Sequence, residues 1–99
     1  MKDARMVAEE LLRVSTEMVS LAQAGAWGDV TAQEAERARL LAQLPVADPA
    51  QRQTLQNLLA HNEQILQLAG AARDALGEAL GQHQQRHRAL SAYLHAGID

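Results

Sequence analysis

Two of the four histidines have a spacing that could hold a metal ion. His83 and His87 are four residues apart, so on an α-helix their imidazoles project from one face. His61 and His95 are remote from this pair, and no carboxylate occupies a neighbouring position on that face. Zinc sites use three or four protein ligands. The pair is therefore an incomplete ligand set, and we expect neither a metal nor a cofactor in this chain.

The other reactive side chains do not form a catalytic arrangement. The chain has no cysteine, which excludes disulfides and thiolate metal sites. Ser15, Ser20 and Ser91 lack the signature of a nucleophile beside a base. No glycine-rich phosphate loop is present, and the acidic residues at positions 9, 10, 17, 34 and 36 are spread over solvent-facing positions. We expect no catalytic residues and a protein that is not an enzyme.

Charge and hydropathy also bear on the partners of this chain. The formal charge is −3, and the short basic cluster at residues 86–88 has only Tyr93 as a nearby aromatic, so nucleic acid is not an expected partner. No apolar run approaches the roughly 20 residues that span a membrane. The first five residues are not followed by the apolar stretch of a secretory signal. We expect a cytoplasmic protein that binds other proteins.

Composition predicts helices before any pattern is considered. The 99 residues include 20 alanines and 15 leucines, both strong helix formers. Phenylalanine is absent, and valine and isoleucine together number only 7, so residues that favour strands are scarce. We expect an all-α protein, more than roughly 60% helical, that forms a single domain over residues 1–99.

Two helices are predicted in the first half of the chain. One runs from Asp3 to Ala24, with a stripe of apolar residues at spacings of four and three: Val7, Leu11, Val14, Met18 and Leu21. Gly25 suits the end of that helix. A second helix should begin between Trp27 and Thr31, with Thr31 and Glu34 as a capping box, and end near Leu44. Its expected apolar positions are Val30, Ala35, Ala38, Leu41 and Leu44.

A third helix is predicted to begin at Asp48-Pro49. Aspartate caps a helix well and proline suits the first helical position. The helical pattern continues to at least Leu80, and Gly81 is the expected place for a break. A last helical segment runs from Gln84 to about Ala96. The predicted architecture is an antiparallel bundle of three main helices plus a short C-terminal helical segment.

The apolar residues of the third helix cover an arc of roughly 200°, wider than the 100° that packing on one core requires. Leu58, Ile65, Ala69 and Leu76 lie at the centre of the arc. Leu59, Leu66 and Leu80 form one flank; the other flank holds Leu68 and Ala72, Ala75 and Ala79. The excess width indicates a groove for a partner helix, a second subunit or the C-terminal segment. A central helix in a closed bundle would show the same width.

Three stretches of the sequence resemble the flagellar export chaperone FliT family, and together they extend over almost the whole chain. Residues 20–27, Ser-Leu-Ala-Gln-Ala-Gly-Ala-Trp, are similar to the junction between the family's first two helices. Residues 34–41 are similar to its charged second helix. Residues 62–66 and the late Tyr93 are similar to its third helix and C-terminal element.

The resemblance implies a cytosolic bacterial chaperone. It would bind the C-terminal helical segment of the filament-cap protein FliD, keep it soluble, and deliver it to the export gate FlhA and the export ATPase complex. In some members it implies inhibition of the transcription activator FlhDC. We expect partner binding at seven residues, which are Leu59, Asn62, Leu66, Ala69, Leu76, Leu80 and Tyr93.

Other functions remain open at this level. A FlgN-like chaperone for the hook-filament junction proteins would have similar charged helices. A structural helical module would use its apolar surface for self-association, as a homodimer for example. A metal-dependent enzyme would use His83 and His87. Family members often continue into a fuller fourth helix, whereas this chain ends six residues after Tyr93, so we do not expect autoinhibition by such a helix.

Overall fold

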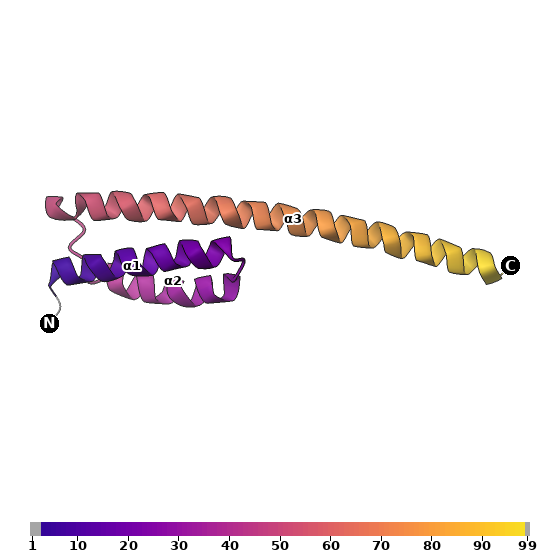
Figure 1. Cartoon of the computed structure of the whole chain (residues 1–99), viewed down its shortest axis with the longest axis horizontal. Coiled ribbons are helices and arrows are strands. Elements are labelled where there is room, and N and C mark those ends of the chain that lie inside the picture. The colour runs from indigo at the N-terminus through magenta and orange to yellow at the C-terminus, as the bar shows by residue number, and fades with distance from the viewer. Residues whose placement is uncertain (1–2, 99) are drawn as a thin grey trace. The chain divides into compact units, whose positions relative to one another are not determined.

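The computed structural model describes residues 3–98, and these residues form helices and turns without a strand. The elements are α1 (Ala4–Gln23), α2 (Trp27–Leu41), the short 3-10 helix η1 (Pro49–Gln51) and α3 (Arg52–Ile98). The chain divides into two compact units, one ending at Ala69 and one beginning at Gly70. In the first unit, α1, α2 and the start of α3 lie side by side (Figure 1). The predicted all-α bundle is confirmed.

α1 supplies most of the core of the first unit. The Asp3 carboxylate caps the helix by accepting a hydrogen bond from the Met6 backbone N–H at 2.8 Å. Four of the five residues of the predicted stripe are buried, namely Val7, Leu11, Val14 and Met18, and Leu21 is half-buried against them. A second buried row on α1 consists of small residues (Ala8, Ser15 and Ala22), and the Ser15 hydroxyl in this row lies 2.9 Å from His61 Nδ1 on α3. Ala35 and Ala38, two of the apolar positions predicted for α2, are exposed.

The turn after α1 has the geometry that its glycine predicts. Gly25 has a φ of 75°, which a residue without a side chain adopts at little cost. The Gly25 N–H donates to the Ala22 carbonyl and the Ala26 N–H to the Leu21 carbonyl, the paired bonds of a Schellman motif. α2 then begins at Trp27, within the predicted window. The predicted capping box is wrong, because Thr31 already lies inside the helix and its hydroxyl donates to the Trp27 carbonyl.

The core face of α2 differs from the predicted one by a single residue. Leu40 is fully buried, whereas Leu41, the expected core residue, is exposed. Neighbouring residues on a helix differ by about 100°, so only one leucine of this pair can face α1. α2 ends at Leu41, three residues before the predicted end, and the turn that follows carries buried Leu44. Val30 is buried as expected.

α3 is entered through a capped turn. The Asp48 carboxylate accepts from the Ala50 N–H at 3.0 Å, and Pro49 occupies the first position of η1, as predicted. Leu58 and Ile65 at the centre of the apolar arc are buried, whereas Leu76 is exposed. Leu58 and Ile65 belong to the first unit and Leu76 to the second.

The predicted break at Gly81 is wrong, since α3 continues through it to Ile98 and the expected separate C-terminal segment is part of this helix. Each helical glycine costs about 1 kcal/mol relative to alanine, but the residues around Gly81 are mostly alanine, leucine, glutamine and arginine, which favour helix. No proline interrupts α3, and an added Cβ at Gly81 would meet nothing within 4 Å. A weak helix former without a competing interaction is not enough to end the helix.

Replacing Leu11 with alanine should lower the free energy of unfolding by about 2–5 kcal/mol, because the side chain has no exposed surface and its loss leaves a cavity. The control is Met6→Ala on the same helix, where half-exposed Met6 should cost less than about 0.5 kcal/mol. Urea unfolding followed by circular dichroism compares the two. Equal losses would mean that α1 does not bury this stripe.

Candidate partner-binding groove

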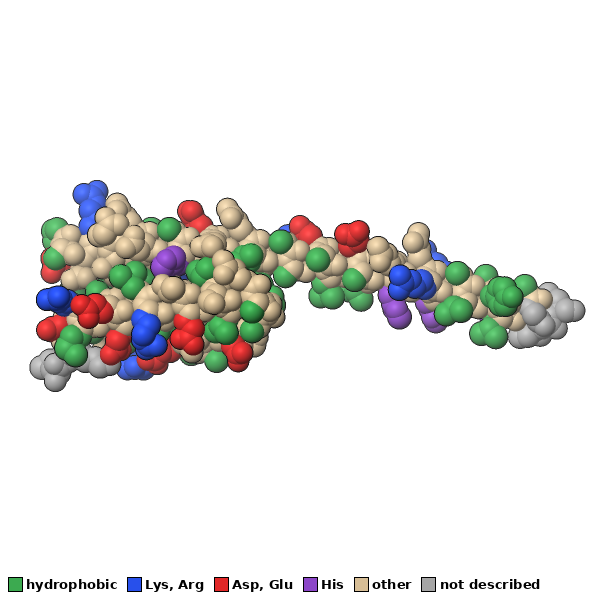
Figure 2. Space-filling view, viewed as in Figure 1, with side chains coloured by type: hydrophobic (Ala, Val, Ile, Leu, Met, Phe, Trp, Pro, Cys, Tyr) green, Lys and Arg blue, Asp and Glu red, His purple; other side chains and the backbone are tan. Residues whose placement is uncertain are grey.

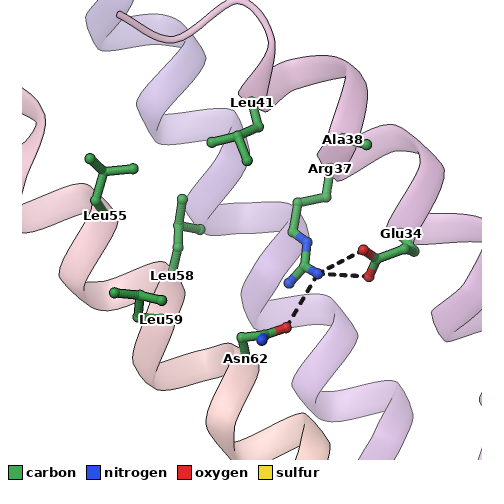
Figure 3. Close-up of a pocket in the computed structure, with 8 residues that line it drawn as sticks. All are labelled: Glu34, Arg37, Ala38, Leu41, Leu55, Leu58, Leu59 and Asn62. Atoms are coloured by element: carbon green, nitrogen blue, oxygen red, sulfur yellow. Dashed lines mark hydrogen bonds and ion pairs between the residues drawn. The ribbon is translucent and has the colours of Figure 1, made fainter. Parts of the chain in front are cut away.

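A groove of about 430 Å³ lies between α2 and α3 in the first unit (Figure 3). We call it the α2–α3 groove. Half of its lining comes from α2 and half from α3, and the residues are Glu34, Arg37, Ala38, Leu41, Leu55, Leu58, Leu59 and Asn62. The two helices therefore share the groove equally.

One end of the groove is apolar. Leu41 from α2 lies opposite Leu55 and Leu58 from α3, with Leu59 at the rim (Figure 3). Leu58 is buried and forms the floor, whereas Leu59 is 64% exposed. A leucine side chain that becomes buried gains about 1.5–3 kcal/mol, so the exposed leucines favour covering by another apolar surface.

The other end is polar and internally neutralised. Arg37 Nη2 donates to both carboxylate oxygens of Glu34, at 2.9 and 2.7 Å, and to the Asn62 side-chain oxygen at 3.3 Å. The Arg37 side chain is only 16% exposed. Asn62 thus accepts a hydrogen bond from another helix. Because the charges cancel, the groove suits apolar side chains better than a charged ligand.

Of the seven residues expected to bind a partner, the structure brings Leu59 and Asn62 together in the α2–α3 groove. Leu66 lies seven residues after Leu59, so it shares that flank of α3, and it is 62% exposed. Ala69 is half-buried at the end of the first unit. The other three belong to the second unit and are exposed, namely Leu76, Leu80 and Tyr93.

The α2 side of the groove was not predicted. Leu41 and Ala38 were assigned to the core, and Arg37 and Glu34 were treated as part of a charged surface. One signal could have found them. The Leu40-Leu41 pair offers two large side chains where the core has room for one, so the second must face a different surface.

The structure also joins two residues that the sequence does not connect. The Ser15 hydroxyl and His61 Nδ1 lie 2.9 Å apart and link α1 to α3. Ser15 has no exposed surface, so no substrate reaches its oxygen and the contact stabilises the helix packing. His83 and His87 are exposed, and among the residues described no three histidine or acidic side chains form a cluster suited to a metal. No described helix is long and apolar enough to cross a membrane.

Comparison with known proteins gives one match. The family model described as "Flagellar protein FliT" matches residues 7–95, which include almost all of α1, the whole of α2 and most of α3. No curated protein and no solved structure matches the sequence. The matched range contains both sides of the α2–α3 groove.

Replacing Arg37 with alanine should lower stability by about 1 kcal/mol, because the change breaks the bonds to Glu34 and Asn62 beside a partly buried site. For a domain of this size that is a fall of about 4–8 °C in the melting temperature. Arg39→Ala is the matched control, since Arg39 pairs with Glu36 at the same i, i+3 spacing but is 55% exposed. It should leave the melting temperature nearly unchanged. If Arg39→Ala lowered the melting temperature more than Arg37→Ala does, the polar end of the groove would not link α2 to α3.

Proposed function

The chain belongs to the FliT family of flagellar proteins, a family of flagellar export chaperones, and on this basis we propose that it binds the C-terminal helical segment of the filament-cap protein FliD. Binding would keep FliD soluble and competent for export. The observation that carries the proposal is the α2–α3 groove, in which Leu41 and Leu59 remain exposed in the free protein.

The groove has the features that an amphipathic helix needs. Such a helix inserts side chains spaced three, four and seven residues apart into an apolar groove. Leu59 and Leu66 stand about 10 Å apart along α3, which is the spacing of two helical turns. Leu41 on the opposite side supplies a second apolar wall. The cancelled charges of Arg37 and Glu34 leave little preference for a charged partner segment.

Family membership supports the further steps of the proposed function. After binding FliD in the bacterial cytosol, the chaperone would deliver it to the export gate FlhA and the export ATPase complex. Inhibition of the transcription activator FlhDC is a further role that some members of the family have. The groove itself supports only the binding of FliD. That binding requires an apolar surface large enough for a single helix.

A pair of neighbouring substitutions on α3 separates binding from folding. Leu66→Asp should weaken binding of a FliD C-terminal peptide by more than about 1 kcal/mol, since a charge would enter an apolar contact. It should change the melting temperature little, because Leu66 is exposed in the free protein. Ile65→Asp should unfold the first unit, because Ile65 is buried. Calorimetric titration and thermal melting of each variant measure the two effects.

Two outcomes would contradict this proposal. If Leu66→Asp destabilises the protein as much as Ile65→Asp, its flank belongs to the core and cannot receive a partner. If Leu66→Asp and a second variant, Leu59→Asp, both bind the peptide as tightly as the unaltered protein, the exposed flank of α3 is not the recognition surface.

A further inference from the structure

A narrow stripe of exposed side chains runs along α3 in the second unit. It consists of six residues at successive spacings of four, three, four, three and four: Leu76, Leu80, His83, His87, Leu90 and Leu94. At 100° per residue all six fall within an arc of about 80°. The four leucines are each more than half exposed, and both histidines are exposed. Figure 2 shows hydrophobic and histidine side chains along this part of the helix.

The stripe is symmetric about Gln85 in both spacing and residue type. Two leucines precede the histidine pair and two follow it, at matching distances from the centre. When such a helix meets a second copy running antiparallel, Leu76 comes level with Leu94 of the second copy and Leu80 with Leu90. The histidines also come level, His83 with His87 of the second copy and His87 with His83. The stripe is therefore complementary to itself.

We propose that two copies of this chain associate through this stripe in an antiparallel arrangement, and that the four imidazoles at its centre hold one divalent transition-metal ion. One chain offers two ligands at the i, i+4 spacing that lets both reach a single ion. The second copy completes the set of four that zinc takes in a closed, tetrahedral site. The site is incomplete in either chain alone, which is why no cluster of three ligands occurs among the described residues of one chain.

The surroundings of the histidine pair favour this occupant over an unrelated partner. The stripe carries no carboxylate and no lysine or arginine, so it offers an approaching helix apolar contacts and imidazoles only. The flanking leucines provide a dry rim on both sides of the ion. Asp74 and Glu78 lie on the opposite face of α3, about 160° from the centre of the stripe, so no carboxylate approaches the imidazoles.

Sedimentation equilibrium with zinc chloride or with EDTA tests the metal site. Zinc should tighten dimerisation by at least about tenfold, because an ion that binds only the dimer shifts the equilibrium towards it. The ratio should be one zinc per two chains by elemental analysis. His83→Ala should abolish the zinc effect. His95→Ala is the control, since exposed His95 lies off the stripe with its Nδ1 bonded to the Ser91 carbonyl, and it should behave as the unaltered protein.

Single cysteines test the orientation, because the chain has no thiol of its own. A mixture of Leu76→Cys and Leu94→Cys chains should form a disulfide between the two variants under mild oxidation with zinc present. Leu76→Cys alone should not, because the two thiols would lie about 27 Å apart in the antiparallel pair. A disulfide in Leu76→Cys alone would contradict the orientation. Zinc that leaves the mass unchanged would overturn the metal site. A dimer that is as tight in EDTA, or in His83→Ala with zinc, as the unaltered protein is with zinc would overturn it too.

Discussion

The length of α3 is the constraint on which the rest of this structure depends. α3 has 47 residues, whereas α1 has 20 and α2 has 15. Leu58 and Ile65 of α3 are buried within the first unit, whereas Leu76 and Leu80 in the second unit are more than half exposed. The apolar residues that continue along α3 remain exposed. Exposed apolar patches mark interaction sites, so the exposed leucines of α3 are the physical origin of both proposals.

Within the first unit, the helices share a buried core and leave a groove between α2 and α3. α1 and α2 pack against each other with Leu11 and Leu40 fully buried, and Ser15 on α1 contacts His61 on α3. Between α2 and α3 a groove lined by four leucines remains, and the hydrogen bond from Arg37 to Asn62 links the two helices at its polar end. A chaperone for a helical segment requires this combination, because the fold must be stable without the partner while an apolar surface stays available to it.

Much of this fold follows from the sequence, and the failures have a common physical cause. Gly25, Asp48 and the stripe of α1 were predicted correctly, because each depends on backbone geometry or on one helix face. Leu59 and Asn62, two of the residues expected to bind a partner, line the α2–α3 groove, and their binding role stays a prediction. Three features were missed: Leu40 is buried where Leu41 was expected, α2 forms one wall of the groove, and Ser15 bonds to His61. Each depends on how the helices pack together, and periodicity along one helix does not determine that packing. The predicted break at Gly81 gave too much weight to the low helix propensity of one glycine and too little to the helix-forming residues around it.

The central claim is that the α2–α3 groove receives a partner helix, and leucine-methyl NMR during titration with a FliD C-terminal peptide tests it most directly. The methyl signals of Leu41, Leu55 and Leu59 should shift together and saturate at one peptide per chain, because these side chains line the groove. The signals of Leu11, which is fully buried against α2, should stay nearly unchanged. Saturating shifts confined to leucines outside the groove, with Leu41, Leu55 and Leu59 unaffected, would contradict the account.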